Sequence, residues 1–417
     1  MSRKFDRLLD GNIHPDYADV VSCLIRQIPK HQHGGSAVCV YHNGRKVVDI
    51  WGGSKDKQGS PWTEDTTAPS FSTTKGVLST LVHILVDQGH AEYSDPVAKF
   101  WPEFAARGKQ HITIQHALSH EAGLYRLSEM IDSPQEMLDW EHMKGVIADA
   151  KPAHQAGEHH GYHAVTYGWL IGGLIEAITG KSLQCVLQDE LVDPLQLDGM
   201  FIGMPHNEMF RRAKLIHNDG VMGAKKSSAR GNGNWNEARE TMGDWTEYLL
   251  EKVGVELSEF RSALRLNEDF DWNAEQTVQA VIPAANGQFT ARSLARMYAM
   301  LANGGELDGV RILSQASIQN IAATQSSGRD KVLFIPMQWR LGYHKAFAPG
   351  ITAPYAFGHY GYGGSGAFCD PQRNLALALT LNSGVGTPLG DSRIPRMARA
   401  VIKAVDRINH TNTSKGP

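Results

Sequence analysis

The segment PSFSTTKGVLSTLV, residues 69–82, places a serine and a lysine at the start of an apolar helix. From Thr73 to His90 the apolar residues recur on most sides of the predicted helix, which is typical of a helix buried at the centre of a protein. Residues three apart share one helix face, so we expect Lys75 beside the Ser72 hydroxyl. Burial lowers the pKa of a lysine, which can then accept the proton of an attacking serine. The segment therefore predicts a nucleophilic serine at a helix N-terminus, where free amide groups favour developing negative charge.

The Ser-x-x-Lys spacing has a second interpretation, because four-residue matches of this kind arise by chance. In that interpretation Ser70 or Ser72 caps the helix and the Lys75 ammonium is solvated. The rest of the chain has to decide between the two.

Strands are predicted at both ends of the chain and helices between them. SAVCVYHNGRKVVDIWGG, residues 36–53, alternates around Asn43-Gly44, which indicates a β-hairpin with a tight turn. GSGAFCDP and NLALALTLN, residues 364–382, indicate two paired strands across the turn 370–374, and a final helix follows at 394–408. The intervening residues, roughly 95–300, mostly carry the helical period.

The economical arrangement is an α+β fold of the α/β sandwich type. One antiparallel sheet is built from both termini and has flanking helices, and a mostly helical domain is inserted. We expect residues 1–95 and 285–417 to form the sheet domain and 96–284 the helical domain, with the active site in the cleft between them. The polar, Gly-rich segment 223–236 is predicted to be an exposed loop.

Composition excludes several classes of function. The 417 residues are 41% hydrophobic and carry a net charge of -3 without a long basic block, which disfavours a nucleic-acid partner. The four cysteines are scattered without pairing, so neither a disulfide framework nor a zinc site is indicated. No apolar run has the length of a membrane span or of a secretory signal, so we expect a cytoplasmic protein without membrane contact. No cofactor or metal is expected.

Two further motifs carry a resemblance. AGEHHGYHA, residues 156–164, lies mid-chain, and FGHYGYGGSG, residues 357–366, lies late. With Ser72 and Lys75 they resemble the penicillin-recognising serine enzymes, which have Ser-x-x-Lys early, Tyr-x-Asn or Ser-x-Asn mid-chain and Lys-Thr-Gly late. The chain is most similar to the family VIII carboxylesterases, relatives of the class C β-lactamases, over nearly its whole length.

The resemblance implies roles for individual residues. Tyr162 takes the position of the catalytic tyrosine, and His359-Tyr360-Gly361 replaces Lys-Thr-Gly. The backbone N–H groups of Ser72 and Tyr362 are then the donors to the oxyanion. Gly361 would let the strand edge approach the substrate closely.

Two departures from the β-lactamase pattern favour an ester substrate. Ala164 stands where those enzymes have an asparagine that binds a substrate amide, and His359 stands where a lysine would attract a carboxylate. We therefore expect a serine carboxylesterase that acts on small esters through an acyl-enzyme. The alternatives are a β-lactamase, a D-Ala-D-Ala carboxypeptidase or transpeptidase, an acyltransferase, or a non-catalytic scaffold. Oligomeric state is open.

The expected mechanism has Ser72 attacking while Lys75 and Tyr162 share its proton. Nearby cationic or buried groups are expected to lower the pKa of Tyr162, giving a phenolate-like base, although the sequence does not decide which residue is the primary base. His359 could orient Tyr162, contact substrate, or be a structural strand histidine. The sequence does not distinguish a pocket-lining role from a structural role for Trp339, Tyr125 and the loop around Asn232.

Two other sites are weighed against this one. The string Gly363–Ala367 resembles Gly-x-Ser-x-Gly but lacks the final glycine and a following helix, so it is rejected. His154, His159, His160 and His163 cluster around Tyr162, but they lack the HExxH spacing of a catalytic zinc site. A metal centre is therefore disfavoured.

Overall fold

A nine-stranded antiparallel sheet joins the two ends of the chain, in the order β1-β3-β2-β15-β14-β13-β12-β11-β10. Its strands are β1 Asp10–Ile13, β2 Gly35–His42, β3 Arg45–Gly53, β10 Ser326–Arg329, β11 Pro336–Trp339, β12 His344–Lys345, β13 Phe357–Tyr360, β14 Gly366–Asp370 and β15 Leu375–Leu381. The N-terminal strand β2 pairs directly with the C-terminal strand β15, with Ser36 opposite Leu381 and His42 opposite Leu375. The prediction of one sheet built from both ends is confirmed.

The structure is a computed structural model and describes residues 9–27, 34–217, 257–264, 270–384 and 391–414. The loop predicted at 223–236 lies outside these ranges. The other described strands are short. Three of them, β4 Ala68–Pro69, β7 Gln288–Phe289 and β5 Met200–Phe201, form a three-stranded sheet. The rest form two pairs, β6 Ile216–His217 with β16 Ser383–Gly384 and β8 Glu306–Leu307 with β9 Val310–Arg311.

The predicted hairpin of residues 36–53 is present as β2 and β3. Its turn residues Asn43 and Gly44 have φ angles of 50° and 70°. Two successive positive φ values match the right-handed twist of the flanking strands, which is why Asn-Gly is favoured there.

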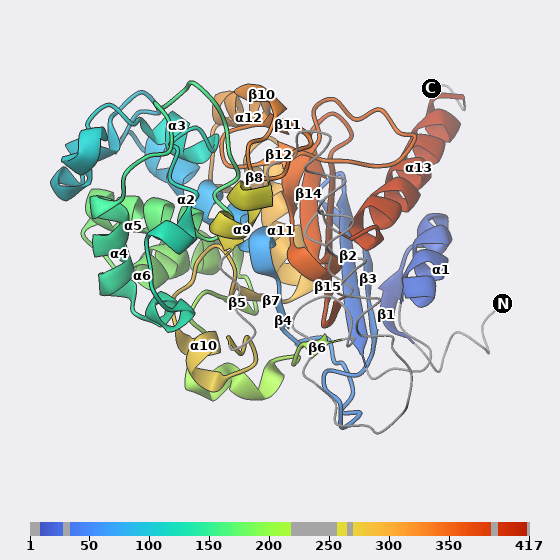
Figure 1. Cartoon of the computed structure of the whole chain (residues 1–417). Coiled ribbons are helices and arrows are strands. Elements are labelled where there is room, and N and C mark those ends of the chain that lie inside the picture. Colours follow the sequence, from blue (N-terminus) through green and yellow to red (C-terminus); the bar gives the residue numbers. More distant parts are fainter. Residues whose placement is uncertain (1–8, 28–33, 218–256, 265–269, 385–390, 415–417) are drawn as a thin grey trace.

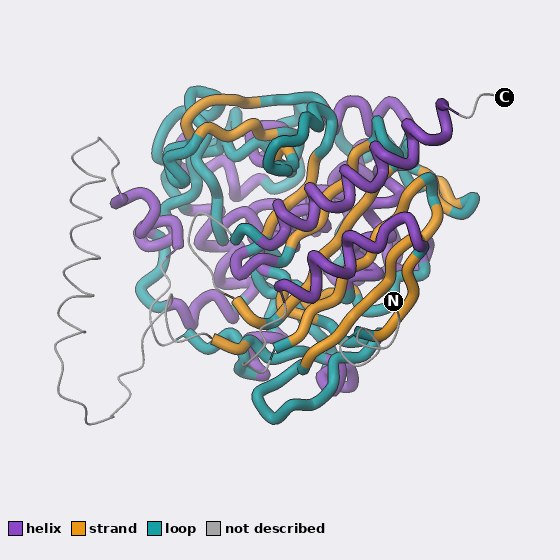
Figure 2. Tube along the Cα trace, turned by 90° about the vertical axis from the view of Figure 1, so that its right-hand side faces the viewer, coloured by secondary structure: helices purple, strands orange, loops and turns teal. Residues whose placement is uncertain are grey.

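Helices cover both faces of the sheet. The side chains of β2 and β15 alternate between the two faces, so each of these strands contributes to two hydrophobic cores. Val38 and Val40 belong to a core shared with the helices α1 Ala18–Gln27 and α13 Arg393–Ser414. Cys39 points to the other core, which contains α11 Ala291–Ala302. Figure 1 shows α1 and α13 on one side of the sheet and α11 on the other, and Figure 2 shows α1 and α13 lying over the strands.

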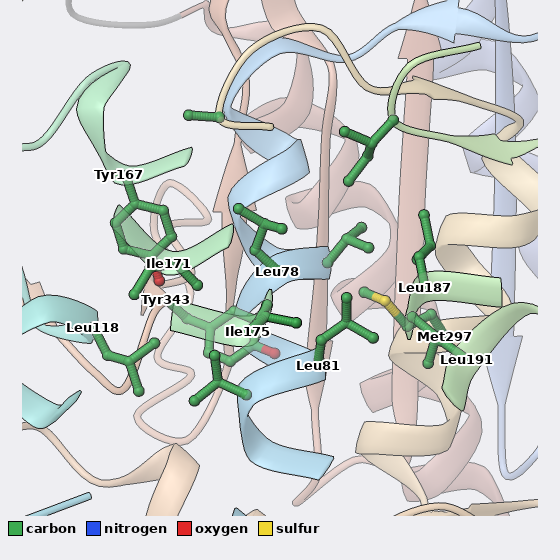
Figure 3. Close-up of a cluster of buried hydrophobic side chains, with 14 of the residues drawn as sticks. Leu78, Leu81, Leu118, Tyr167, Ile171, Ile175, Leu187, Leu191, Met297 and Tyr343 are labelled. Atoms are coloured by element: carbon green, nitrogen blue, oxygen red, sulfur yellow. The ribbon is translucent and has the colours of Figure 1, made fainter. Parts of the chain in front are cut away.

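Helix α2, Thr74–Asp87, is the central element of the larger core, as its apolar sequence predicts. Every residue from Thr74 to Leu85 is buried. Figure 3 shows Leu78 and Leu81 of α2 packed among side chains of the helices and strands around them. Its polar side chains have partners: the Ser79 hydroxyl lies 2.7 Å from the Tyr167 hydroxyl, and Thr80 lies 2.8 Å from Tyr343. A helix anchored in this way holds its N-terminus in a fixed place.

The remaining helices come mostly from the middle of the chain. They are α3 Ile114–Leu118, α4 Trp140–Asp149, α5 Thr166–Thr179, α6 Leu183–Leu187, α7 Asp193–Leu195, α9 Leu257–Leu264, α10 Glu275–Gln279 and α12 Gln315–Ala322. The described 3-10 helical turns are η1 Pro15–Tyr17, η2 Phe71–Thr73, η3 Val97–Lys99, η4 Pro102–Gly108, η5 Leu127–Glu129, η6 Pro134–Leu138, η8 His206–Arg211 and η9 Tyr362–Gly364, and η7 Gln188–Val192 is a π-helical turn. The α+β class is confirmed, and the domain limits proposed above stay a prediction.

Within the described ranges, no single helix has both the length and the apolar composition to cross a membrane. One pair of helices, Thr166–Thr179 and Leu183–Leu195, would meet that test together but is bent by 81°.

Candidate active site

Ser72 lies in the turn η2, directly before α2. Gly287, directly before β7, holds this turn in place through two hydrogen bonds. Ser70 N–H donates to Gly287 O at 2.9 Å, and Gly287 N–H donates to Thr74 Oγ1 at 3.2 Å. Phe71 has a φ of 44°, which is a costly left-handed conformation for a bulky residue. Strain of this kind persists only where the surroundings impose it, and here it presents the next residue, Ser72, at the helix N-terminus.

Lys75 is the immediate partner of Ser72. Its Nζ lies 2.9 Å from Ser72 Oγ, 2.7 Å from Ala164 O and 3.1 Å from Ala284 O. The side chain is fully buried, and burial lowers the pKa of Lys75 well below its usual value. A neutral amine has two N–H groups, which suit the two carbonyls, and one lone pair, which faces the Ser72 hydroxyl. The buried arrangement predicted for Lys75 is present, and the solvated alternative is wrong.

Tyr162 lies in the connection between α4 and α5, and it joins the same cluster. Lys75 Nζ is 4.9 Å from the centroid of the Tyr162 ring. The ring is stacked with that of Trp339 at 5.5 Å and an interplanar angle of 6°, and with that of His359 at 6.1 Å and 28°. The structure therefore brings Ser72 and Lys75, at the start of α2, together with Tyr162 from the connection between α4 and α5.

The expectation that neighbouring cationic or buried groups lower the pKa of Tyr162 is wrong. Burial raises the pKa of the Tyr162 phenol, and only an interaction with the Ser72 side chain acts in the opposite direction. The expectation required Lys75 to supply a cation, but burial disfavours the ammonium form and lowers the pKa of Lys75 well below its usual value. The direction of this shift favours Tyr162 as a proton donor over Tyr162 as a base.

The late motif approaches Ser72 from the sheet. Gly361 follows β13, and a Cβ at this position would lie 2.3 Å from Ser70 O, so only glycine fits. Tyr362 follows in η9, and its ring meets the Phe71 ring edge-to-face at a centroid distance of 5.5 Å. The predicted oxyanion donors at Ser72 and Tyr362 thus belong to two turns that pack against each other.

His359 is buried in β13 and carries no charge. Its Nδ1 lies 3.1 Å from Tyr360 O, so Nδ1 holds the proton and Nε2 is an acceptor. Burial lowers the pKa of His359 well below its usual value, and the nearby His344 and Lys75 act in the same direction. Where a lysine would present a positive charge, this chain has a neutral imidazole beside Tyr162.

The histidines around Tyr162 have structural partners. His163 Nε2 accepts the N–H of Leu124 at 2.9 Å, and His160 Nδ1 lies 2.8 Å from Ser326 Oγ. Across the described ranges, no three histidine, cysteine, aspartate or glutamate side chains gather as they would around a metal ion.

Three features of the site have no signal in the sequence. Asp330 lies under Tyr162 and accepts its backbone N–H at 3.1 Å. His120, with a φ of 63°, places its ring 4.2 Å from that of Trp339. Trp272 comes from a distant segment and meets the Phe71 ring at 5.6 Å, which adds an apolar surface beside the nucleophile. Of the side chains left open, Trp339 belongs to the site through its stacking on Tyr162.

Comparison with known proteins agrees with this geometry. The profile of the beta-lactamase family matches residues 19–402. The chain is 35% identical over 381 residues to the esterase/beta-lactamase LipL of Mycobacterium tuberculosis, an alignment that covers 90% of this chain and 83% of that protein.

Solved structures give the same result. A penicillin-binding protein homologue from Caulobacter crescentus has a TM-score of 0.80 at 30% identity and covers 95% of this chain and 99% of its own. A family VIII carboxylesterase has a TM-score of 0.81 at 29% identity, with the same coverage of 95% and 99%. Because the matched profile covers the sheet from β2 to β15 and every segment of the site, the chain belongs to the beta-lactamase family.

Proposed function

We propose that this protein is a serine carboxylesterase that cleaves small neutral esters through an acyl-enzyme on Ser72. The observation that carries the proposal is the fully buried Lys75 side chain, whose Nζ lies 2.9 Å from Ser72 Oγ and whose other partners are two backbone carbonyls. A buried amine with its lone pair on a serine hydroxyl is an activated nucleophile–base pair. The relatives named as an esterase/beta-lactamase and as a family VIII carboxylesterase support the same chemistry.

In the first half-reaction, Ser72 Oγ bonds to the carbonyl carbon and its proton passes to Lys75 Nζ. The backbone N–H groups of Ser72 and Tyr362 donate to the oxyanion, and each such donor is worth about 10²–10³ in rate. When the C–O bond breaks, the Tyr162 phenol gives its proton to the leaving alkoxide, and the Lys75 ammonium returns a proton to the phenolate. The high pKa of the buried phenol suits it to this donor role.

In the second half-reaction, water adds to the acyl carbon and loses a proton to Lys75 Nζ. The tetrahedral adduct then collapses, the acid leaves, and the Lys75 ammonium returns the proton to Ser72 Oγ. The enzyme ends in the state in which it began, so no cofactor is required by this scheme.

A neutral ester is favoured over a substrate with a carboxylate. The position of the family's lysine holds His359, which burial keeps uncharged, and Ala164 has no side-chain amide to offer. Beside the nucleophile, the rings of Phe71, Trp272 and Tyr362 form an apolar surface. A negatively charged group would find no positive side chain among these five residues to offset its desolvation.

The test is hydrolysis of p-nitrophenyl acetate, butyrate and octanoate by the wild type and by Ser72→Ala. We expect turnover by the wild type and a fall of more than about 10³-fold in the variant. Ser365→Ala is the matched control, because it removes the serine of the rejected Gly-x-Ser-x string while its backbone carbonyl still accepts Gly361 N–H at 2.7 Å. Turnover that survives Ser72→Ala would refute the proposal.

β-Lactam hydrolysis is the second candidate, favoured by the name of the Mycobacterium relative. It predicts turnover of a chromogenic cephalosporin at a rate that rivals the short esters. Addition of an alcohol acceptor to the ester assay would reveal acyl transfer as a new ester product. The cytoplasmic location stays a prediction that fractionation of the native cells would test.

A further inference from the structure

Asp330 is a fully buried carboxylate that lies directly after β10. Its Oδ1 accepts the backbone N–H groups of Tyr162 at 3.1 Å, Val332 at 2.8 Å and Leu333 at 2.9 Å. Its Oδ2 accepts the indole Nε1–H of Trp339 at 3.0 Å. In the described part of the chain, no lysine, arginine or histidine forms an ion pair with it. A buried carboxylate is costly, so four N–H donors converging on one side chain call for an explanation.

The four donors belong to two groups. Val332 and Leu333 lie in the turn that follows Asp330 itself, and they fix the orientation of its carboxylate. Tyr162 and Trp339 are distant in sequence, and their two rings are stacked at an interplanar angle of 6°. Asp330 therefore holds Tyr162 twice, once through its main chain and once through the ring on which its phenol is stacked.

Tyr162 needs such an anchor because no helix or strand contains it. Its neighbours in the chain are also attached to the β10 region: His160 Nδ1 lies 2.8 Å from Ser326 Oγ, and Lys331 N–H donates to His160 O at 3.0 Å. Among these hydrogen bonds to the β10 region, the one accepted by Asp330 is the one made by Tyr162 itself.

We propose that Asp330 is a positioning residue, which fixes the Tyr162 phenol relative to Ser72 by binding the Tyr162 main chain and the Trp339 ring together. This rests on the proposed function, in which the phenol protonates the leaving group. A proton donor must lie within hydrogen-bond reach of its acceptor, so a small displacement of the phenol lowers the rate without changing how much substrate binds.

The carboxylate also affects the acidity of the phenol. Burial is the main cause of the raised pKa of Tyr162, and the negative charge of Asp330 adds to it. Removing that charge is therefore expected to lower the pKa of the phenol. The alkaline limb of the kcat profile, above which the phenol has lost its proton, should then move to lower pH.

The experiment is a double-mutant cycle of Asp330→Asn and Trp339→Phe, with kcat and KM measured on p-nitrophenyl butyrate. An asparagine keeps one oxygen for the backbone donors, but its NH₂ group faces the indole N–H, so two donors conflict. Trp339→Phe keeps a stacked ring and removes the indole donor, which relieves the conflict. We expect Asp330→Asn to lower kcat by about 10–100-fold and to leave KM within about threefold of the wild-type value. In the Trp339→Phe background, the same substitution should lower log kcat by less than half as much.

The matched control is Asp370→Asn, which changes another fully buried aspartate. Asp370 Oδ2 pairs with Arg373 at 2.7 Å at the end of β14, and the hydrogen bonds of its carboxylate go to Gln372 and Arg373 instead of Tyr162 or Ser72. It should lower the thermal midpoint and leave kcat and the pH profile unchanged.

The rate at which a fluorophosphonate labels Ser72 separates this proposal from the proposed function. If the wild type is labelled but hydrolyses no ester, the proposed esterase function is wrong. The double-mutant cycle is then evaluated from the labelling rates of the four proteins instead of from kcat. A folded Asp330→Asn with wild-type kcat and pH profile, or with the same fold-loss in both backgrounds, would overturn the positioning role. If neither Asp330→Asn nor the double variant folds, Asp330 serves the fold alone and the proposal is wrong.

Discussion

Lys75 and Lys109 are two fully buried lysines whose surroundings differ in one partner. Lys109 Nζ donates to three backbone carbonyls, of Ala106, Ala148 and Ala150. Three acceptors suit an ammonium, which has three N–H groups and no lone pair. Lys75 has two carbonyls and a hydroxyl, which suit a neutral amine. The third partner therefore distinguishes the two lysines. Lys109 has a third carbonyl and serves to bind the backbone, whereas Lys75 has the Ser72 hydroxyl and can accept its proton.

Exchange of each lysine for methionine tests this difference. Lys75→Met should lower kcat for ester hydrolysis by more than about 10³-fold, because Ser72 loses its base. Lys109→Met should leave kcat of the folded protein within about twofold and lower its thermal midpoint, because three carbonyls lose their donor. Near-normal kcat in folded Lys75→Met would contradict the assignment of Lys75 as the base.

At the scale of elements, the approach of β13 to the turn η2 depends on the absence of a side chain at Gly361. A Cβ there would lie 2.3 Å from Ser70 O and 2.9 Å from Thr73 Oγ1, so the strand end or the turn has to move. Gly361→Ala should therefore lower kcat by about 10²–10³-fold, the cost of one misplaced oxyanion donor. Circular dichroism would establish that the variant is folded.

The control for this change is Gly145→Ala within α4. A Cβ at Gly145 would meet no atom within 4 Å. We expect unchanged kcat and a gain of about 0.5–1 kcal/mol in the free energy of unfolding, because glycine is unfavourable inside a helix. Full activity of Gly361→Ala would show that the close contact of β13 and η2 is not needed for catalysis.

Element order, the sheet from both ends and the cluster of Ser72, Lys75 and Tyr162 are predictable from the sequence. The sheet and the pairing of Ser72 with Lys75 depend on local patterns, such as the alternation around Asn43-Gly44 or the apolar helix after Ser72. The place of Tyr162 depends on the resemblance of residues 156–164 to the mid-chain motif of the family. Asp330 is not predictable, because its role exists only when the turn after β10 passes beneath Tyr162. The protonation state of Tyr162 is missed for a related reason, since a pKa depends on burial from every side and not on the neighbouring residues alone.

At the scale of the whole molecule, several buried histidines make stability depend on pH. Burial lowers the pKa of His83 and His163 to about 3 and that of His344 to about 4. In the unfolded chain these groups titrate near 6.5, so unfolding takes up protons between these values. Their stabilising contribution is complete above about pH 6.5 and is lost as the pH falls toward the folded values.

Each of these histidines should lower the free energy of unfolding by about 1.4 kcal/mol per pH unit between about pH 6 and 4. Urea unfolding at a series of pH values measures the slope. His83→Gln should reduce the slope by the share of one histidine, and His206→Gln, whose side chain is 82% exposed, should leave it unchanged. An unchanged slope in His83→Gln would refute this account of acid lability.

The junction of β2 with β15 has a consequence for how the chain is made. The Ser36 hydroxyl donates to Thr380 O, 344 positions further along the chain. At translation rates of about 5–20 residues per second, β2 leaves the ribosome roughly 17–70 seconds before its neighbour exists. Throughout that interval the hairpin of β2 and β3 has an unpaired edge and two apolar faces, as aggregation-prone strands do. A nascent chain stalled before residue 375 therefore lacks β15, the strand that joins the N-terminal and C-terminal parts of the sheet. Quality-control proteases and chaperones should engage the newborn protein first at the exposed edge of β2.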